Sequence, residues 1–181
     1  MTIAQPTTST WTVDKTHSNV DFQVKHMVIS TVRGHFREFE GTLYIDQGQP
    51  ENSRVTASID VASIDTNAED RDAHLRSDDF FNTDDYPKMT FTSTNVERVN
   101  DSRFRVTGDL TIRDVTQEVV LDGEYHGPIT DPWGGSRAAF DATTEISRKE
   151  FNVRWNQALE TGGLVVSDNV KIHLHIEAIL Q

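Results

Sequence analysis

Residues 103–113 read RFRVTGDLTIR, and along this stretch the side chains alternate between polar and apolar. One face carries the apolar residues Phe104, Val106, Leu110 and Ile112, with Gly108 in the same register. A period of two over this length is typical of a β-strand with one buried face and one solvated face. The segment therefore predicts a half-buried strand.

The same alternation, or a strand-like composition, recurs along most of the chain. It is found in residues 20–25, 36–45, 55–61, 89–99, 119–125, 138–146 and 170–177. With residues 103–113 this gives about eight strands. Short links between neighbouring strands favour antiparallel pairing, and the polar outer faces argue against a buried parallel sheet.

One segment, residues 66–76 (TNAEDRDAHLR), breaks the period of two. Thr66 and Glu69 have the spacing of a capping box, and acidic residues crowd the first turn, where the helix dipole favours them. Asp72 and Arg76 are four residues apart and are expected to form an ion pair. The segment predicts one short helix.

The composition limits the classes of partner. The 17 Lys and Arg residues against 29 Asp and Glu residues give a net charge of −12. Such a surface is expected to repel nucleic acid and anionic membrane headgroups. Because the chain contains no cysteine, it has no disulfides, thiol catalysis or zinc–thiolate sites.

The beginning of the chain, MTIAQPTTST, has neither a basic region nor an apolar run of the kind found in secretory signals. We therefore expect a cytoplasmic protein, with a flexible segment at residues 1–10 and a single domain over residues 11–181. No stretch is long and apolar enough for a membrane span, so stable membrane insertion is not expected.

An all-β fold of about eight antiparallel strands is expected to close into a barrel, because closure removes exposed strand edges. A barrel of this size is either filled by its own side chains or holds one small ligand. Small inward positions alternate with large ones: Ala57, Gly108, Gly123, Ala138 and Ala142 against Phe22, Phe36, Phe91, Phe104 and Phe140. This mixture fits a narrow apolar tunnel and a tapered, fully packed core equally well.

Several motifs together resemble the YceI-like family. They are WTVDKTHSNVDF at 11–22, VKHM at 24–27, VRGHF at 32–36, LRSDDFF at 75–81, YPKMTF at 86–91 and GDLTI at 108–112. The match runs in order from about residue 11 to the end of the chain. In one place the chain departs from the family pattern, since Arg113 and Asp114 stand where His and Gly are common.

The resemblance implies an eight-stranded antiparallel lipocalin-like barrel that binds a polyisoprenoid-type lipid, such as an isoprenoid quinone or a polyprenyl chain, in its interior. This is physically coherent, since each CH₂ moved out of water contributes roughly 0.8 kcal/mol. The expected occupant is one apolar long-chain molecule, with no other cofactor.

Most of the predicted ligand-binding residues follow from the parity of the strands, whereas Phe80, Phe81 and Trp155 are expected in loops and His26 is part of the family resemblance. The predicted residues are Phe22, Val24, His26, Phe36, Phe80, Phe81, Phe91, Val106, Leu110, Phe140 and Trp155. Phe80 and Phe81 stand next to each other in an acidic loop and are expected near one end of the barrel. Trp155 is expected to cover one mouth of the barrel. His17 and His26 are expected to hydrogen-bond the backbone, and the alternative for His26 is that it holds a polar head group of the ligand.

The sequence shows no catalytic motif and no strong metal motif. His173 and His175 share one face of a strand, but that face is opposite the apolar one, which favours solvated side chains over a metal site. We therefore expect a binding protein and not an enzyme, and the charge is compatible with a homodimer. Two alternatives stay open: an enzyme acting on an isoprenoid-like substrate, and a structural or interaction protein with a packed core.

Overall fold

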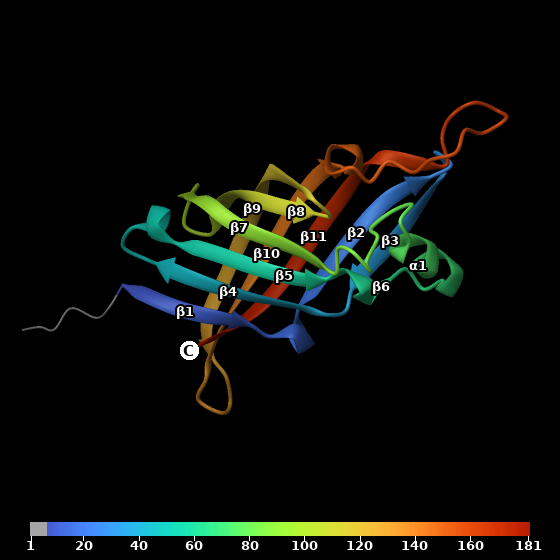
Figure 1. The fold of residues 1–181 in the computed structure, drawn as a ribbon. Helices are drawn as coiled ribbons and strands as arrows, with labels where there is room; N and C mark the ends of the chain where they lie inside the picture. Colours follow the sequence, from blue (N-terminus) through green and yellow to red (C-terminus); the bar gives the residue numbers. More distant parts are fainter. Residues whose placement is uncertain (1–6) are drawn as a thin grey trace, which may run out of the picture.

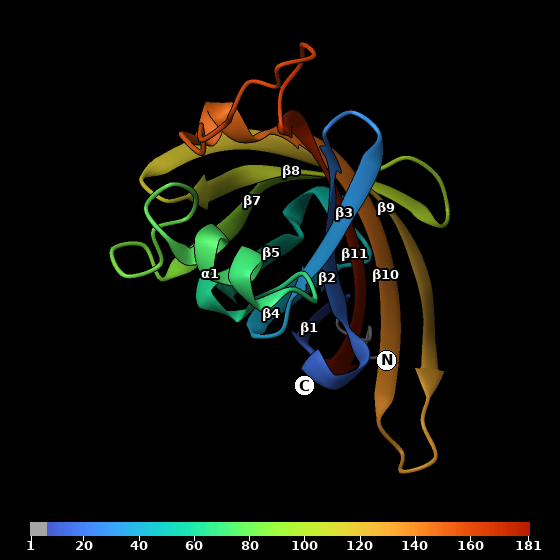
Figure 2. The same ribbon diagram turned by 90° about the vertical axis from the view of Figure 1, so that its right-hand side faces the viewer.

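The computed structural model describes residues 7–181, which form one sheet of eleven strands and a short α-helix (Figure 1). The strands are β1 (Thr8–Val13), β2 (Asn19–His26), β3 (Ser30–Phe36), β4 (Phe39–Asp46), β5 (Arg54–Asp60), β6 (Ile64–Asp65), β7 (Lys88–Arg98), β8 (Arg103–Ile112), β9 (Val115–Thr130), β10 (Ser136–Ser147) and β11 (Val166–Leu180). The helix α1 (Glu69–Arg76) packs against β6, which pairs with β3 (Figures 1 and 2).

Eight of these strands close into a ring. Its order is β1-β4-β5-β7-β8-β9-β10-β11, and β11 then pairs with β1. Every pairing is antiparallel. The predicted fold class, an eight-stranded antiparallel barrel with one short helix, is confirmed. The strands β2, β3 and β6 extend the sheet from the other part of β11.

The set of strands differs from the prediction at the beginning of the chain. Residues 36–45 were expected to form one strand, but they are divided between β3 and β4. The break lies at Arg37 and Glu38, whose backbone N–H groups donate to the carbonyl and the hydroxyl of Ser63. The strand β1 lacks strict alternation and was not predicted, yet it closes the ring.

Residues 8–10, part of the segment expected to be flexible, pair with β4 in the barrel. Their ladder runs from Thr8 opposite Asp46 to Thr12 opposite Thr42. Residues 1–6 of that segment lie outside the described part of the chain.

The inward alternation of β8 is confirmed, with a different role for its glycine. A Cβ atom at Gly108 would lie 2.5 Å from Cζ of Phe91 and 2.6 Å from the carbonyl oxygen of Thr92. The missing side chain therefore makes room for the Phe91 ring, and this small residue does not itself create open space.

The beginning of α1 differs from the predicted capping box. The N-cap residue is Ala68, and no side chain caps the helix. Thr66 is buried, and both its backbone N–H and its hydroxyl donate to Oδ1 of Asp72, at 2.9 and 2.6 Å. Asp72 therefore points back into the protein and does not pair with Arg76, whose guanidinium donates to the carbonyls of Ala62 and Ile64.

Within residues 7–181, no helix is long and apolar enough to cross a membrane.

The Thr66–Asp72 contact is expected to fix α1 against the barrel. Asp72→Ala would leave the buried N–H and hydroxyl of Thr66 without their acceptor, so the free energy of unfolding should fall by about 1–3 kcal/mol. Urea denaturation measures this. The control is Asp70→Ala in the same helix turn, where the side chain is exposed, and it should cost less than about 1 kcal/mol. Equal effects of the two substitutions would contradict the assigned role.

Candidate ligand-binding cavity

A cavity of about 600 Å³ runs through the inside of the barrel. Every strand of the ring contributes to its wall, and the side chains of the wall are mostly apolar. On β8, Phe104, Val106, Leu110 and Ile112 all face it, as the alternation of residues 103–113 predicts. The volume falls within the range of about 300–1,000 Å³ in which proteins bury most of a small organic ligand.

All but two of the predicted ligand-binding residues line this cavity. Those that do are Phe22, Val24, Phe36, Phe80, Phe81, Phe91, Val106, Leu110 and Phe140. Their contact with a ligand stays a prediction. The wall also contains residues that the sequence did not single out, among them Trp11, Phe151 and Arg148.

Aromatic rings close the end of the cavity near α1. Phe80 is buried, and Phe81 lies with its ring centroid 6.3 Å from that of Phe36. Phe36 in turn lies 5.7 Å from Phe22. The adjacent phenylalanines therefore lie at one end of the barrel, and their contact with a ligand stays a prediction.

Two predicted residues, Trp155 and His26, lie elsewhere. The ring of Trp155 packs on Phe80 at 5.3 Å and on His74 at 4.8 Å, so Phe80 separates it from the cavity. His26 has the same parity as Val24 and lies at the last position of β2, opposite Val166 and Ser30, but it does not line the cavity. Neither residue lines the cavity, and whether either of them contacts a ligand stays a prediction.

Two arginines fix the closed end. Arg148 is buried, and its guanidinium donates to the backbone carbonyls of Val153, Trp155, Val166 and Ser167. Desolvation by burial lowers its pKa. A buried arginine is rare and leaves no pattern in a sequence, which is why this residue was missed.

The other arginine is Arg113, which stands where the sequence departs from the family pattern. It occupies the turn between β8 and β9 with a left-handed φ of 55°. Its guanidinium donates to the carbonyls of Phe80 and Asn152 and lies over the ring of Tyr86. Arg113, which stands where His is common in the family, therefore holds the loop that carries Phe80.

The opposite end of the cavity has a polar rim. The β4–β5 turn contributes Asp46 and Ser53, and the β7–β8 turn contributes Arg98 and Asp101. Nη2 of Arg98 lies 2.8 Å from Oδ1 of Asp101. Tyr125 lies in the wall nearby on β9, and desolvation raises the pKa of its hydroxyl, which therefore stays a hydrogen-bond donor. This end brings carboxylate, hydroxyl and guanidinium side chains to the cavity.

The histidines of β11 lie on the outer face of the barrel, as expected. Nδ1 of His175 lies 2.7 Å from Oδ1 of Asp141 on β10. His173 and His126 approach the same carboxylate at 3.8 and 3.6 Å. These contacts give each of the three histidines a charged partner across neighbouring strands.

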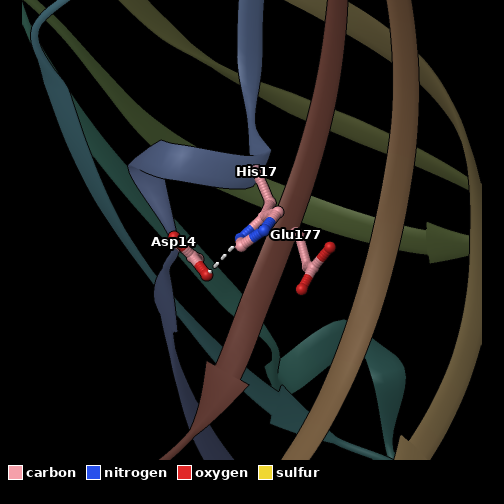
Figure 3. Close-up of side chains that lie close together, drawn as sticks. All are labelled: Asp14, His17 and Glu177. Atoms are coloured by element: carbon pink, nitrogen blue, oxygen red, sulfur yellow. Dashed lines mark hydrogen bonds and ion pairs between the residues drawn. The ribbon is translucent and has the colours of Figure 1, made fainter. Parts of the chain in front are cut away.

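Another charged cluster marks the corner between β1 and β2 (Figure 3). Nδ1 of His17 lies 2.9 Å from Oδ2 of Asp14, so its partner is a carboxylate and not the backbone that the sequence suggested. Nη1 of Arg137 donates to Asp14 at 2.8 Å and to Glu177 at 2.7 Å. The hydroxyl of Ser18 donates to the carbonyl of Asp14 and accepts the N–H of Glu177.

Asp14, His17 and Glu177 form the one group in the described part of the chain whose ligand atoms are close enough to hold a metal ion. However, the guanidinium of Arg137 already supplies positive charge to both carboxylates. The hydrogen bonds from His17 and Arg137 lower the pKa of Asp14 from 3.8 to about 2. This arrangement fits an ion-pair network that fixes the corner.

Comparison with known proteins gives concordant matches. A model of the YceI-like domain matches residues 11–178. Protein YceI of Shigella flexneri is 44% identical over 138 residues, which cover 76% of this chain and 72% of that protein. The structure of BcnA from Burkholderia cenocepacia has a TM-score of 0.80 at 26% identity and covers 91% of this chain and 98% of that one.

A polyisoprenoid binding domain from Saccharophagus degradans, implicated in plant cell wall breakdown, has a TM-score of 0.69. It covers 94% of this chain and 98% of that domain. Because its identity is 16%, this likeness shows the shared fold alone.

The corner cluster generates a prediction on pH. Since the pKa of Asp14 is lower in the folded protein, its contribution to stability is present above pH 4 and is lost as the pH falls toward 2. Asp14→Asn should lower the free energy of unfolding by about 1–3 kcal/mol at pH 7. Denaturation curves should show this difference narrowing between pH 4 and pH 2. A difference that stays constant over this range would contradict the role of the carboxylate.

Proposed function

Because this chain belongs to the YceI-like family, we propose that its cavity binds one long isoprenoid-type chain, which the protein stores, shields or transports. The single observation that carries the proposal is the cavity of about 600 Å³ inside the barrel, with its mostly apolar wall. The resemblance seen in the sequence is confirmed as family membership. The identity of the lipid, an isoprenoid quinone or a polyprenol, is part of the proposal.

The wall suits an extended hydrocarbon chain. It contains the rings of Phe91 and Phe104 and the branched side chains of Val106, Leu110 and Ile176. Each CH₂ group moved out of water contributes roughly 0.8 kcal/mol, so a long chain can bind without many polar contacts. The polyisoprenoid binding domain of the same fold supports this class of ligand.

The polar rim suits the head of such a molecule. A quinone carbonyl or a terminal hydroxyl at this end would find donors in Tyr125, Ser53 and Arg98. The closed end, where Phe80 and Phe81 meet the cavity, would hold the tail. We propose this orientation, with the head at the rim and the tail at the aromatic end.

The alternatives fit the cavity less well. A fully packed core would leave no interior volume of this size. An enzyme would need an acid–base group at the ligand, and neither His17 nor His26, the histidines within the family motifs, lines the cavity. We therefore favour binding over catalysis.

A mass measurement tests the proposal. The protein, purified from a host that makes isoprenoid lipids, is extracted with organic solvent beside an unrelated protein from the same host. A stoichiometric isoprenoid species in its extract alone is expected. If the extract is empty and neither an added long-chain quinone nor an added polyprenol raises the melting temperature, the proposal fails.

A substitution that fills the cavity locates the ligand. Val106→Trp places an indole in the tunnel and should lower the amount of bound chain at least about tenfold, with a change in stability below about 3 kcal/mol. The matched control is Arg105→Trp, one residue away on the exposed face of β8, which should bind as the unsubstituted protein does. Equal binding by both variants would place the ligand outside the barrel.

A further inference from the structure

The turn between β2 and β3 exposes three large apolar side chains in succession. Met27, Val28 and Ile29 are 40%, 72% and 85% exposed, and Leu164 from the loop before β11 is 42% exposed. The N–H of Met27 donates to the carbonyl of Val165 at 2.9 Å, which holds the turn and the loop together. Both project side by side at one end of the molecule (Figure 2). We call these four side chains the apolar tip.

The backbone of this turn is unusual for the residues it contains. Met27 and Val28 have φ values of 51° and 67°, both left-handed. Met27 and Val28 lie in a three-residue loop, since His26 pairs with Ser30. Gly and Asn adopt positive φ most readily, and a β-branched residue such as Val28 rarely does. The chain thus has apolar residues at positions where the backbone conformation favours Gly or Asn. This points to a role for these side chains in contact with another molecule, beyond the stability of the fold.

The charge around the apolar tip is opposite to that of the whole protein. Residues 22–37 contain no Asp or Glu in a chain of net charge −12. Lys25 and Arg33 lie on the two strands of this hairpin, and neither takes part in the ion pairs of the described residues. The neighbouring loop adds one acid, Glu160. Since salt screens charges beyond about 8 Å, a surface that touches the tip meets mainly Lys25, two residues from Met27, whereas Arg33 lies farther along β3 beside Asp65 and Glu145.

The apolar tip also lies near the cavity. Val24 and Val166 line the cavity and stand next to the turn and the loop of the tip. Val24 is three residues from Met27, or about 10 Å along a strand. The pairing of β11 with β2 is interrupted between Val166 and Val170, so the wall has a break in its ladder beside the tip.

We propose that the apolar tip docks on the surface of a lipid bilayer that contains anionic phospholipids. The apolar side chains enter the interface, and Lys25 contacts the headgroup phosphates. This contact is peripheral and involves no spanning segment. The purpose of this docking rests on the proposed function. Long isoprenoid chains reside in bilayers, and docking brings the cavity of the protein close to them. The repulsion expected from the net charge applies to the remainder of the surface.

Vesicle sedimentation tests the docking. Vesicles of phosphatidylcholine alone are compared with vesicles that also contain phosphatidylglycerol. The protein should sediment with the latter, and Met27→Asn combined with Val28→Gly should weaken this binding at least about tenfold. Because Asn and Gly adopt positive φ at little cost, the melting temperature of this variant should be equal or higher, which excludes unfolding as the cause.

The β9–β10 hairpin provides the matched control, because it exposes Trp133 at the opposite end of the molecule (Figures 1 and 2). Trp133→Ser should leave vesicle binding unchanged, and Lys25→Glu should weaken it on the anionic vesicles. Three results would overturn the proposal: no sedimentation of the unsubstituted protein, equal binding to both kinds of vesicle, or a loss caused by Trp133→Ser and not by the variant of the tip.

A further measurement distinguishes a failure of the docking proposal from a failure of the proposed lipid binding. Each protein is also titrated, without vesicles, with a polyprenol delivered from ethanol, and the bound amount is measured after extraction. The variant of the tip should bind polyprenol like the unsubstituted protein. If the unsubstituted protein docks but takes up no polyprenol, the proposed function fails while the docking stands; uptake without docking gives the reverse result.

Discussion

The pairing of β11 with two successive partners is the constraint on which the rest of the structure depends. β11 is one strand from Val166 to Leu180, whereas the chain beside it is divided into β2 and β1 by the turn at Lys15–His17. Ser18 and Arg137 tie that turn to Asp14 and Glu177. This corner sends β1 toward β4, which closes the ring, and leaves β2 and β3 free to extend the sheet on the other side.

The size of the ring explains why the interior is not filled. Near α1, the aromatic rings of Phe22, Phe36 and Phe81 meet one another and pack the space. Farther along the axis, smaller wall residues such as Val106 and Ala142 do not reach across the barrel, and open volume remains. One end is thus closed by apolar rings and the other is bordered by polar turns, which gives the cavity a direction.

Much of this was predictable because alternation has a simple physical origin. The residues of β8 and most of the cavity wall follow from parity alone. Parity does not say where the wall ends along a strand: on β2 the last lining residue is Val24, and His26, which has the same parity, does not line the cavity. Parity also does not show whether another side chain separates a residue from the cavity, as Phe80 separates Trp155 from it. Buried polar contacts, such as those of Arg148 and Asp72, depend on the tertiary fold and have no local signature.

The central claim is that one apolar chain lies inside the barrel, between the polar rim and the aromatic end. Isotope-filtered NOE spectroscopy tests it most directly, using protein labelled with ¹³C at its methyl groups and an unlabelled polyprenol. The account predicts contacts from the chain to the methyl groups of Val106, Leu110 and Ile176, and none to the exposed methyl groups of Ile129. Contacts confined to surface methyl groups such as those of Ile129, with none inside the barrel, would contradict it.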